Sequence, residues 1–376
     1  MKIVIPKEYV SGERRVPVIP PNAKQLVKLG AQVEIETDMG NLSGYTDDEY
    51  ISAGATVTRD RKALLSSADV VLRLHKPPIE EIDWLKKGGI HISYLDPFNE
   101  KETLDKLVSR GISAVSMEMI PRVTRAQKMD ALSSQASLAG HVAVIVAAER
   151  LNKVFPMMMT PAGTIAPSRV FVIGVGIAGL QAIATAKRLG ARVEAFDTRH
   201  VVKEQVQSLG ARFVEIDLGE TGQTKDGYAK ALTKEQIEKQ QQEMAKHCAM
   251  ADVVITTAQV FGRKAPRIVT REMIMAMKKG SVVVDLAAES GGNVEGSVPG
   301  QEVIVNGVSI IGLKNSASHV ANHASQMYSS NLISFINEFW DGETKSLKLR
   351  LDDEIIKGCL VTHENAIFSE TLKKLM

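Results

Sequence analysis

A glycine-rich turn between a buried strand and a helix is the feature that most constrains this chain. The apolar run Val170–Val175 leads into Gly174-x-Gly176-x-x-Gly179, and an Ala-rich helical pattern follows. The apolar-alternating segment Ala191–Asp197 comes next and ends on an acid. Strand, tight turn, helix and second strand in this order are typical of a dinucleotide-binding βαβ unit. The alternative is a glycine turn in some other parallel α/β domain.

Each glycine has a separate task in such a unit. Gly174 allows the turn, Gly176 lets the backbone approach a pyrophosphate, and Gly179 lets helix and strand pack closely. The pyrophosphate then lies on backbone N–H groups at the positive end of the helix. Asp197 is placed to accept a hydrogen bond from a ribose 2′-OH. Because a carboxylate repels a 2′-phosphate, the sequence predicts NAD(H) and not NADP(H), although Arg199 weakens this preference.

Composition narrows the class of protein. The 376 residues suffice for two domains, and 44% hydrophobic with 24% charged residues is typical of a soluble globular protein. A net charge of +2 gives no electrostatic reason to expect nucleic acid or an anionic membrane as a partner. No signal peptide is recognisable, and the nearly apolar stretch Leu138–Leu151 is shorter than the roughly 20 residues of a spanning helix. We therefore expect a cytoplasmic protein without direct membrane insertion.

Strands and helices alternate before the glycine turn. Helix-like segments such as Pro21–Ala31 and Glu100–Gly111 lie between short apolar runs. The runs are Ile3–Ile5, Val33–Ile35, Val70–Leu74, Ile90–Tyr94 and Ala114–Met117. Because such alternation implies a parallel sheet covered on both faces, we expect a second α/β domain that has no glycine fingerprint of its own.

Further buried strands are expected after the glycine turn. They are Ala251–Ala258, Lys279–Ala288 and Val308–Asn315, whose carboxyl ends should line the ligand crevice. Residues 132–155 are predicted to form one long helix between domains. The helical pattern of Ser325–Trp340 is expected to return to the first domain.

The predicted fold class is therefore α/β, with two Rossmann-like parallel-sheet domains separated by a cleft. Residues 1–135 plus 325–376 are expected to form the N-terminal domain. Residues 136–324 are expected to form the NAD(H)-binding domain.

A long polar segment, Asp217–His247, interrupts this pattern. Its first part carries three glycines, Gly227 among them, ahead of Tyr228, and its second part is a charged, Gln-rich helix. It is either a lid with glycine hinges beside the ligand crevice or a solvated excursion.

Other segments support smaller predictions. The tail segments LKLRL and KGCLVT alternate like a β-hairpin suited to exchange with a partner subunit. Met157–Met159 are expected to pack at the domain junction, because flexible thioethers fill irregular gaps. His319 and His323 have the spacing of a metal pair but no third ligand nearby, so we expect no metal site. Cys248 and Cys359 are expected to be inert thiols.

Three segments together resemble one known family. They are Pro121–Val144, Phe155–Ala191 and Val283–Asn293. They are similar to the NAD(H)-binding α subunit of proton-translocating nicotinamide nucleotide transhydrogenase, and the similarity extends over essentially the whole chain, including the opening IPKEYVSGERRVP. The segment AQKMDALSSQ is far more specific than the glycine motif. This family is itself similar to alanine dehydrogenase.

The resemblance implies a catalytic loop. In the family, a loop with Arg, Gln and Asp positions the nicotinamide end of NAD(H), and the matching residues here are Arg122, Gln127, Asp130 and Ser133. An Arg offers fixed donors to a pyrophosphate or carboxamide, and an Asp can accept from the carboxamide NH₂. In the family the Gln reaches toward a second nucleotide on another polypeptide. A polar interdomain linker with a helix N-cap is the alternative for this loop.

The resemblance also implies a larger set of NAD(H) contacts, with Tyr228 as the lid residue. The full expected set is Arg122, Val123, Thr124, Arg125, Gln127, Asp130, Ser133, Gly174, Gly176, Ile177, Gly179, Asp197, Thr198, Arg199, Gly227, Tyr228, Gln240, Ala258 and Gln259.

An alanine dehydrogenase-like oxidoreductase is the main alternative function. Alanine oxidation needs a carboxylate clamp and an acid/base group beside the nicotinamide. The clamp positions hold Arg15 and Lys76, but Asp96 stands at the family's His position and Glu289 at its Asp position. Without the imidazole, the group that shuttles a proton near neutral pH is missing. We therefore interpret Arg15 and Lys76 as scaffold residues.

Hydride exchange between two nicotinamides remains, and it needs no proton transfer at the reacting carbons. The resemblance implies NADP(H) on a partner subunit, membrane-spanning subunits that translocate protons, and a homodimer. It places the chain on the cytoplasmic face of the inner membrane through those subunits. A non-catalytic NAD sensor is a third class of function.

Overall fold

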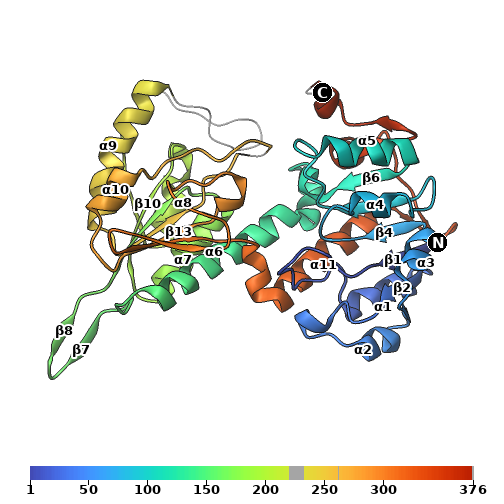
Figure 1. Cartoon of the computed structure of the whole chain (residues 1–376), viewed down its shortest axis with the longest axis horizontal. Coiled ribbons are helices and arrows are strands. Elements are labelled where there is room, and N and C mark those ends of the chain that lie inside the picture. The colour runs from blue at the N-terminus through green and yellow to red at the C-terminus, as the bar shows by residue number, and fades with distance from the viewer. Residues whose placement is uncertain (220–232, 261, 375–376) are drawn as a thin grey trace. The chain divides into compact units, whose positions relative to one another are not determined.

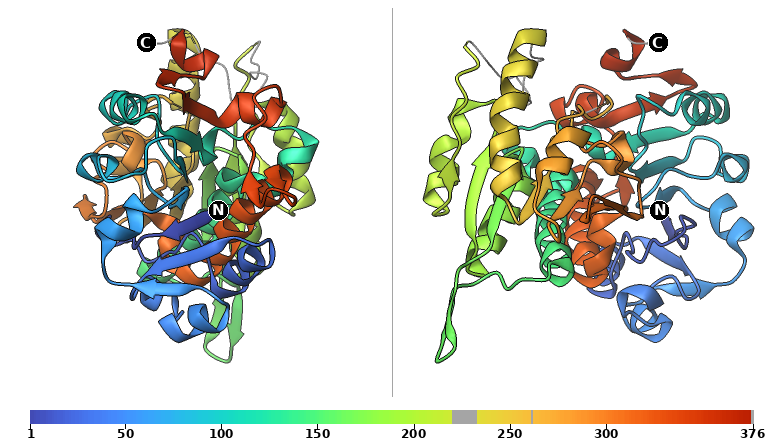
Figure 2. Two further views of the ribbon diagram at one scale, coloured as in Figure 1. Left: turned by 90° about the vertical axis from the view of Figure 1, so that its right-hand side faces the viewer. Right: turned by 60° about the vertical axis from the view of Figure 1, so that its left-hand side comes forward.

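Two compact α/β units make up the chain. The computed structural model describes residues 1–219, 233–260 and 262–374. The N-terminal unit contains Met1–Gln135 together with Ser318–Met376, and the central unit contains Ala136–Ala317. In each unit, helices cover a mostly parallel sheet (Figures 1 and 2). This confirms the predicted fold class of two parallel-sheet α/β domains.

The sheet of the N-terminal unit has the order β19-β18-β6-β5-β4-β1-β2-β3. The strands are β1 (Lys2–Ile5), β2 (Gln32–Glu36), β3 (Thr56–Thr58), β4 (Val70–Leu72), β5 (Ile90–Ser93), β6 (Ser113–Ser116), β18 (Leu360–His363) and β19 (Ala366–Ile367). Strands β1 to β6 are parallel, whereas β18 pairs antiparallel with β6. The C-terminal residues therefore extend a sheet that the N-terminal residues begin.

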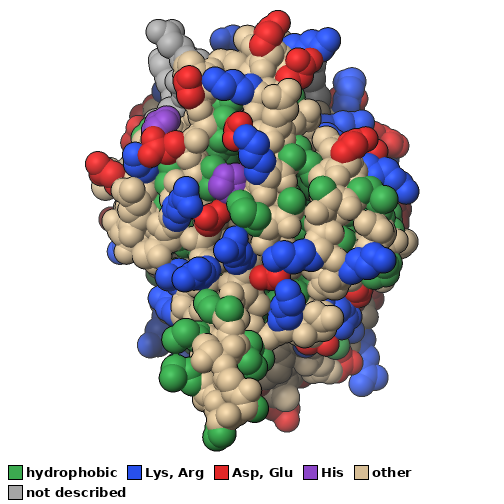
Figure 3. Space-filling view, turned by 90° about the vertical axis from the view of Figure 1, so that its left-hand side faces the viewer, with side chains coloured by type: hydrophobic (Ala, Val, Ile, Leu, Met, Phe, Trp, Pro, Cys, Tyr) green, Lys and Arg blue, Asp and Glu red, His purple; other side chains and the backbone are tan. Residues whose placement is uncertain are grey.

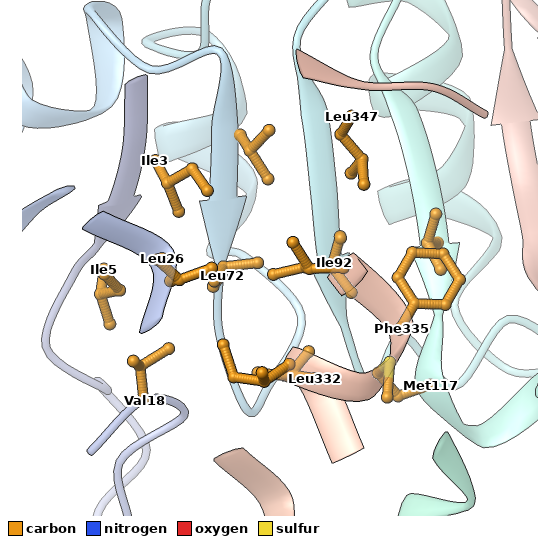
Figure 4. Close-up of a cluster of buried hydrophobic side chains, with 14 of the residues drawn as sticks. Ile3, Ile5, Val18, Leu26, Leu72, Ile92, Met117, Leu332, Phe335 and Leu347 are labelled. Carbon is orange, nitrogen blue, oxygen red and sulfur yellow. The ribbon is translucent and has the colours of Figure 1, made fainter. Parts of the chain in front are cut away.

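Both faces of this sheet are buried. Ile3 and Ile5 belong to one hydrophobic cluster and Val4 to another, as expected when successive side chains of a strand point to opposite faces. Leu332 and Phe335 of α11 complete the first cluster (Figure 4). The helices of this unit are α1 (Pro20–Lys28), α2 (Asp47–Ser52), α3 (Arg61–Ser66), α4 (Ile79–Ile82), α5 (Lys101–Arg110), α11 (Ala321–Phe339), α12 (Glu354–Cys359) and α13 (Glu370–Lys373).

The sheet of the central unit has the order β11-β10-β9-β12-β13-β15-β14. Its strands are β9 (Arg169–Ile173), β10 (Arg192–Phe196), β11 (Arg212–Phe213), β12 (Val253–Thr256), β13 (Val282–Asp285), β14 (Glu302–Val305) and β15 (Val308–Gly312). All pairs are parallel except β14 with β15. Apart from the edge strand β14, this is the Rossmann order, and the order reverses between β9 and β12. Ligands of such sheets bind at that reversal, beyond the carboxyl ends of the strands.

The helices of the central unit are α7 (Ile177–Arg188), α8 (Lys203–Ser208), α9 (Lys234–Met250) and α10 (Arg271–Ala276). Helix α6 (Ala131–Arg150) passes from one unit into the other. It has 20 residues and ends at Arg150, earlier than predicted. Among the described residues it alone is long and apolar enough to cross a membrane, and 39% of its apolar window is buried. A core helix of a soluble protein passes the same test.

Two predictions about short segments are wrong. The methionine run does not pack at a junction, because β7 (Met158–Thr160) and β8 (Gly163–Ile165) form a hairpin that projects from the central unit (Figure 1). Every residue of both strands is exposed, and Met159 is 77% exposed. Hydrophobic side chains gather at the tip of this hairpin (Figure 3).

The C-terminal tail is not a free hairpin either. Leu347 ends β17 (Ser346–Leu347), which pairs with β16 (Trp340–Asp341), and α12 separates this segment from β18. The apolar residues of KGCLVT serve first the end of that helix and then β18, whose Leu360 is buried in the sheet. The predicted alternation is present over β18 only.

Candidate nucleotide-binding site

The glycine turn after β9 contains two glycines that the protein itself requires. Gly174 has a φ of +92°, which side chains rarely adopt. A Cβ on Gly179 would lie 2.0 Å from the Gly174 carbonyl oxygen, so helix and turn meet only without a side chain. Gly176 differs from both, because its φ is −82° and a Cβ there would meet nothing within 4 Å. The space beside Gly176 is therefore open.

Gly176 is also the N-cap of α7. The first N–H groups of a helix have no partner within that helix, and its dipole favours negative charge at this end. Ile177 follows with 41% of its surface exposed. The turn and the start of α7 thus form an open, electropositive backbone surface at the carboxyl end of β9.

Asp197 follows β10 and is bonded to the glycine turn. Its carboxylate accepts a hydrogen bond from the Val175 N–H at 2.7 Å and others from the Arg199 N–H and guanidinium at 2.8–2.9 Å. The guanidinium also donates to the Val175 carbonyl at 3.1 Å. The paired charge raises the pKa of Arg199, mainly through its hydrogen bond to Asp197. The ends of β9 and β10 are thereby joined by one ion pair.

A hollow lies beside this pair, at the carboxyl ends of β10 and β11. The rings of His200 and Phe213 have centroids 5.9 Å apart in its wall. The residues that line it are Phe196, Asp197, Thr198, His200, Phe213, Ile216, Asp217, Leu218 and Gly219. Aromatic and apolar walls with a carboxylate at the edge are suited to a heteroaromatic base next to a sugar hydroxyl.

Beyond β12, Ala258 and Gln259 lie on the other side of the turn. The Gln259 side chain donates to the Leu286 carbonyl at 3.0 Å. Both the N–H and the carbonyl of Ala258 are bonded to the side chain of Asn293. Sequence reasoning did not single out Asn293, and the available signal was an amide directly after the glycine pair in ESGGN.

Three other expected contacts are in the segment predicted as a lid. Gln240 lies in α9 with 8% of its surface exposed, and its amide donates to the Met244 sulfur at 3.4 Å. Gly227 and Tyr228 lie outside the described residues, so the predicted lid does as well.

The loop of Arg122, Val123 and Thr124 belongs to the N-terminal unit and leads into a 3₁₀ helix, η3 (Thr124–Met129). Ala126 and Met129 are buried in the core, as a three-residue turn allows. Gln127, between them, is exposed.

The remaining residues of that loop have partners within their own unit. Asp130 accepts hydrogen bonds from the backbone N–H and the hydroxyl of Ser133, and so caps the start of α6. Arg125 pairs with Asp353 at 2.7 Å and with Glu338 at 3.1 Å. The helix-cap role that the sequence left open is thus present, and Gln127 stands on the exposed surface between these anchors.

The position of the alanine dehydrogenase carboxylate clamp is occupied by internal ion pairs. The Arg15 guanidinium donates to both carboxylate oxygens of Glu13, at 2.7 and 2.9 Å, and to Gln135 at 2.8 Å. Burial alone would raise the pKa of Glu13, but hydrogen bonds from Arg15 and His75 hold that pKa well below its ordinary value of 4.5. Lys76 pairs with Glu100.

The two positions that depart from alanine dehydrogenase are exposed. Asp96 accepts a hydrogen bond from the Asn99 amide at 2.8 Å, as a turn residue does. Glu289 accepts one from the Asn315 N–H at 2.7 Å. Within the described part of the chain, no group of three or more His, Cys, Asp or Glu side chains could hold a metal ion.

Comparison with known proteins agrees with this geometry. The family models "Alanine dehydrogenase/PNT, N-terminal domain" and "Alanine dehydrogenase/PNT, C-terminal domain" match residues 4–139 and 143–370. The chain is 44% identical to a chain of NAD(P) transhydrogenase subunit alpha from Rhodospirillum rubrum, over 99% of both chains.

Solved structures show the same relationship. A transhydrogenase from Sinorhizobium meliloti superposes with a TM-score of 0.88 at 43% identity, covering 98% of this chain and 100% of that one. An L-alanine dehydrogenase superposes with a TM-score of 0.82 at 25% identity, covering 100% and 99%. The chain therefore belongs to the alanine dehydrogenase/PNT family and, within it, to the NAD(P) transhydrogenase alpha subunits.

Proposed function

We propose that the central unit binds NAD(H) across the carboxyl ends of β9, β10 and β12. The pyrophosphate would lie at the start of α7, the adenosine ribose at Asp197, and the adenine in the hollow between Asp197 and Phe213. The observation that carries this proposal is Gly176. Its backbone conformation and its surroundings accept any side chain, so a glycine there serves something that approaches from outside the protein.

The preference for NAD(H) over NADP(H) rests on the Asp197 carboxylate. A 2′-phosphate would have to approach a side chain that is 7% exposed and already bonded to Arg199. Titrating the protein with NADH and with NADPH, followed by nucleotide fluorescence, tests this. We expect NADH to bind more tightly, and tighter binding of NADPH would contradict the role given to Asp197.

The reaction we propose is hydride transfer between NAD(H) on this chain and NADP(H) on a partner subunit, coupled to proton translocation by membrane-spanning subunits. When bound, the dihydronicotinamide supplies the hydride. The chain's own part is to hold and orient the ring and to exclude water. Arg122, Gln127, Asp130 and Ser133 are the residues we assign to that end of the nucleotide.

The N-terminal unit supports this reaction against amino-acid oxidation. Arg15 is neutralised by Glu13 and Lys76 by Glu100, so neither cation is left to clamp a substrate carboxylate. The sharpest test mixes the protein with the NADP(H)-binding chain and follows reduction of an NAD analogue by NADPH. A parallel assay with the protein alone, NAD and alanine should show no NADH absorbance, and turnover there would contradict the proposal.

We also propose a homodimer, held on the cytoplasmic face of the inner membrane through its partner subunits. The exposed methionines and Ile165 of the β7–β8 hairpin support self-association, because contiguous apolar surface of this kind marks interaction sites. Replacing Met158 and Met159 by Ser should shift the mass measured by light scattering from dimer to monomer.

A further inference from the structure

A buried hydrogen-bond network beneath Ala258 joins two loops at the carboxyl edge of the central sheet. Asn293 is 0% exposed. Its side-chain oxygen accepts from the Ala258 N–H at 3.0 Å, and its NH₂ group donates to the carbonyls of Ala258 and Pro266, both at 2.8 Å. All of these contacts are to backbone groups, so the amide holds the path of the chain after β12.

Asp285, the last residue of β13, holds Asn293 in turn. Its carboxylate is 0% exposed and accepts the Asn293 N–H at 3.0 Å, the Val294 N–H at 3.2 Å and the Ala287 N–H at 2.9 Å. It also accepts the Thr256 hydroxyl at 3.1 Å. A buried carboxylate with this many donors is fixed in place, and its position at a strand end fixes the loop that follows.

The network reaches the glycine turn through Thr257. The Thr257 hydroxyl donates to the Gly174 carbonyl at 2.9 Å, and a Cβ on Gly174 would lie 3.0 Å from the Ala258 nitrogen. A displacement of Ala258 would therefore be felt at the turn itself.

We infer that Asn293 is a positioning residue for the nicotinamide half of the bound dinucleotide, a role that rests on the proposed function. In the sheet, β12 and β13 lie on the opposite side of β9 from β10. In Rossmann units the two halves of the dinucleotide lie on opposite sides of this reversal. With the adenosine half at Asp197, the other half lies over the loops that Asn293 joins.

The test compares NADH with 5′-AMP, which carries the adenosine half alone. Asn293→Ala removes all three hydrogen bonds, and Asn293→Asp keeps the size and one acceptor but loses both donors. We expect each variant to bind NADH about tenfold more weakly and 5′-AMP within about twofold of the unchanged protein. A merely structural role would weaken both ligands together.

The matched control is Asn306→Gly. Asn306 also bonds a distant carbonyl, that of Met275 at 3.0 Å, but it stands before the amino end of β15 and has a φ of +50°, which glycine accepts. It should leave both affinities unchanged.

Binding is measured by calorimetry, after circular dichroism has shown that each variant is folded. If the Asn293 variants do not fold, Thr257→Val breaks the next link, and it should weaken NADH and spare 5′-AMP. Unchanged NADH binding by the folded variants, or equal losses of both ligands, would overturn this inference alone. Failure of the unchanged protein to bind NADH would overturn the proposed function as well.

Discussion

The carboxylate of Asp197 accepts a hydrogen bond from the Val175 N–H at 2.7 Å, which ties the end of β10 to the middle of the glycine turn. The acid therefore has a structural partner before any nucleotide arrives. A ribose hydroxyl would join an arrangement that the Arg199 guanidinium already holds in place. This pre-organisation reduces the ordering that binding requires.

Asp197→Ala should weaken NADH binding by about 1–3 kcal/mol, because a ligand hydroxyl and the Val175 N–H both lose their acceptor. Asp197→Asn separates charge from shape, since an amide oxygen can still accept from Val175. We expect Asn to raise the affinity for NADPH relative to NADH, as measured by fluorescence titration. Glu194→Gln, on the same strand, is the control. Equal NADH affinity in all four proteins would mean that the acid does not contact the ribose.

Gly176→Ala and Gly179→Ala should fail in opposite ways. At Gly176 the new Cβ meets no protein atom within 4 Å, so the melting temperature should not change while NADH affinity falls about tenfold or more. At Gly179 the Cβ collides with the Gly174 carbonyl oxygen, so the protein should lose at least about 1–3 kcal/mol of stability. Differential scanning calorimetry with a parallel NADH titration separates the two effects. A Gly176→Ala protein that binds NADH normally would remove the main support for the nucleotide site.

Gln127→Asn should slow hydride transfer in the assembled complex while barely changing NADH affinity. Gln127 is exposed on η3, which buried Ala126 and Met129 anchor, so shortening the side chain changes its reach and not the fold. Stopped-flow reduction of an NAD analogue by NADPH measures the step. Lys128→Gln, at the exposed neighbouring position, is the control. Equal losses of rate and affinity would make Gln127 an ordinary binding residue.

The strands that the sequence predicted are those buried on both faces. β12 and β13 are fully buried and read as unbroken apolar runs. The edge strands β3 and β14 were missed, because Thr56 and Glu302 begin strands that are partly exposed and carry polar residues. The methionine hairpin was misjudged for a related reason, since hydrophobicity indicates that a surface should be buried and not which molecule buries it.

The site was predictable where its reasons are local. The glycine turn follows from steric demands within a few residues of Gly174, and Asp197 follows from its place at the next strand end. Asn293 was not predictable in this way, because its three partners lie up to 35 residues away along the chain. The partners of Arg125, such as Asp353, are still more remote in sequence. Pairing of this kind becomes visible only in the fold.

Both cysteines should resist thiol reagents until the protein unfolds. Cys248 and Cys359 are each 0% exposed, and burial raises the pKa of the Cys248 thiol to about 12 and also raises that of Cys359. The thiolate, which is the reactive form, is therefore both scarce and inaccessible near neutral pH. Labelling with a chromogenic disulfide should be slow in buffer and complete in denaturant. An exposed control thiol introduced as Ser66→Cys should react at once; rapid labelling of the unchanged protein would contradict the buried positions.

Glu13→Gln should change the pH dependence of stability. The folded pKa of Glu13 lies below its ordinary value of 4.5, so its contribution is present above that pH and is lost as the pH falls through the folded pKa. At pH 7 the substitution removes the charge that neutralises buried Arg15, which should cost about 3–5 kcal/mol. Urea unfolding from about pH 7 to about pH 3 should therefore show the gap between the two proteins narrowing below about pH 4. Glu102→Gln, at an exposed position on α5, should follow the unchanged protein throughout. A gap that stays constant with pH would mean that packing at Glu13, and not its charge, stabilises this unit.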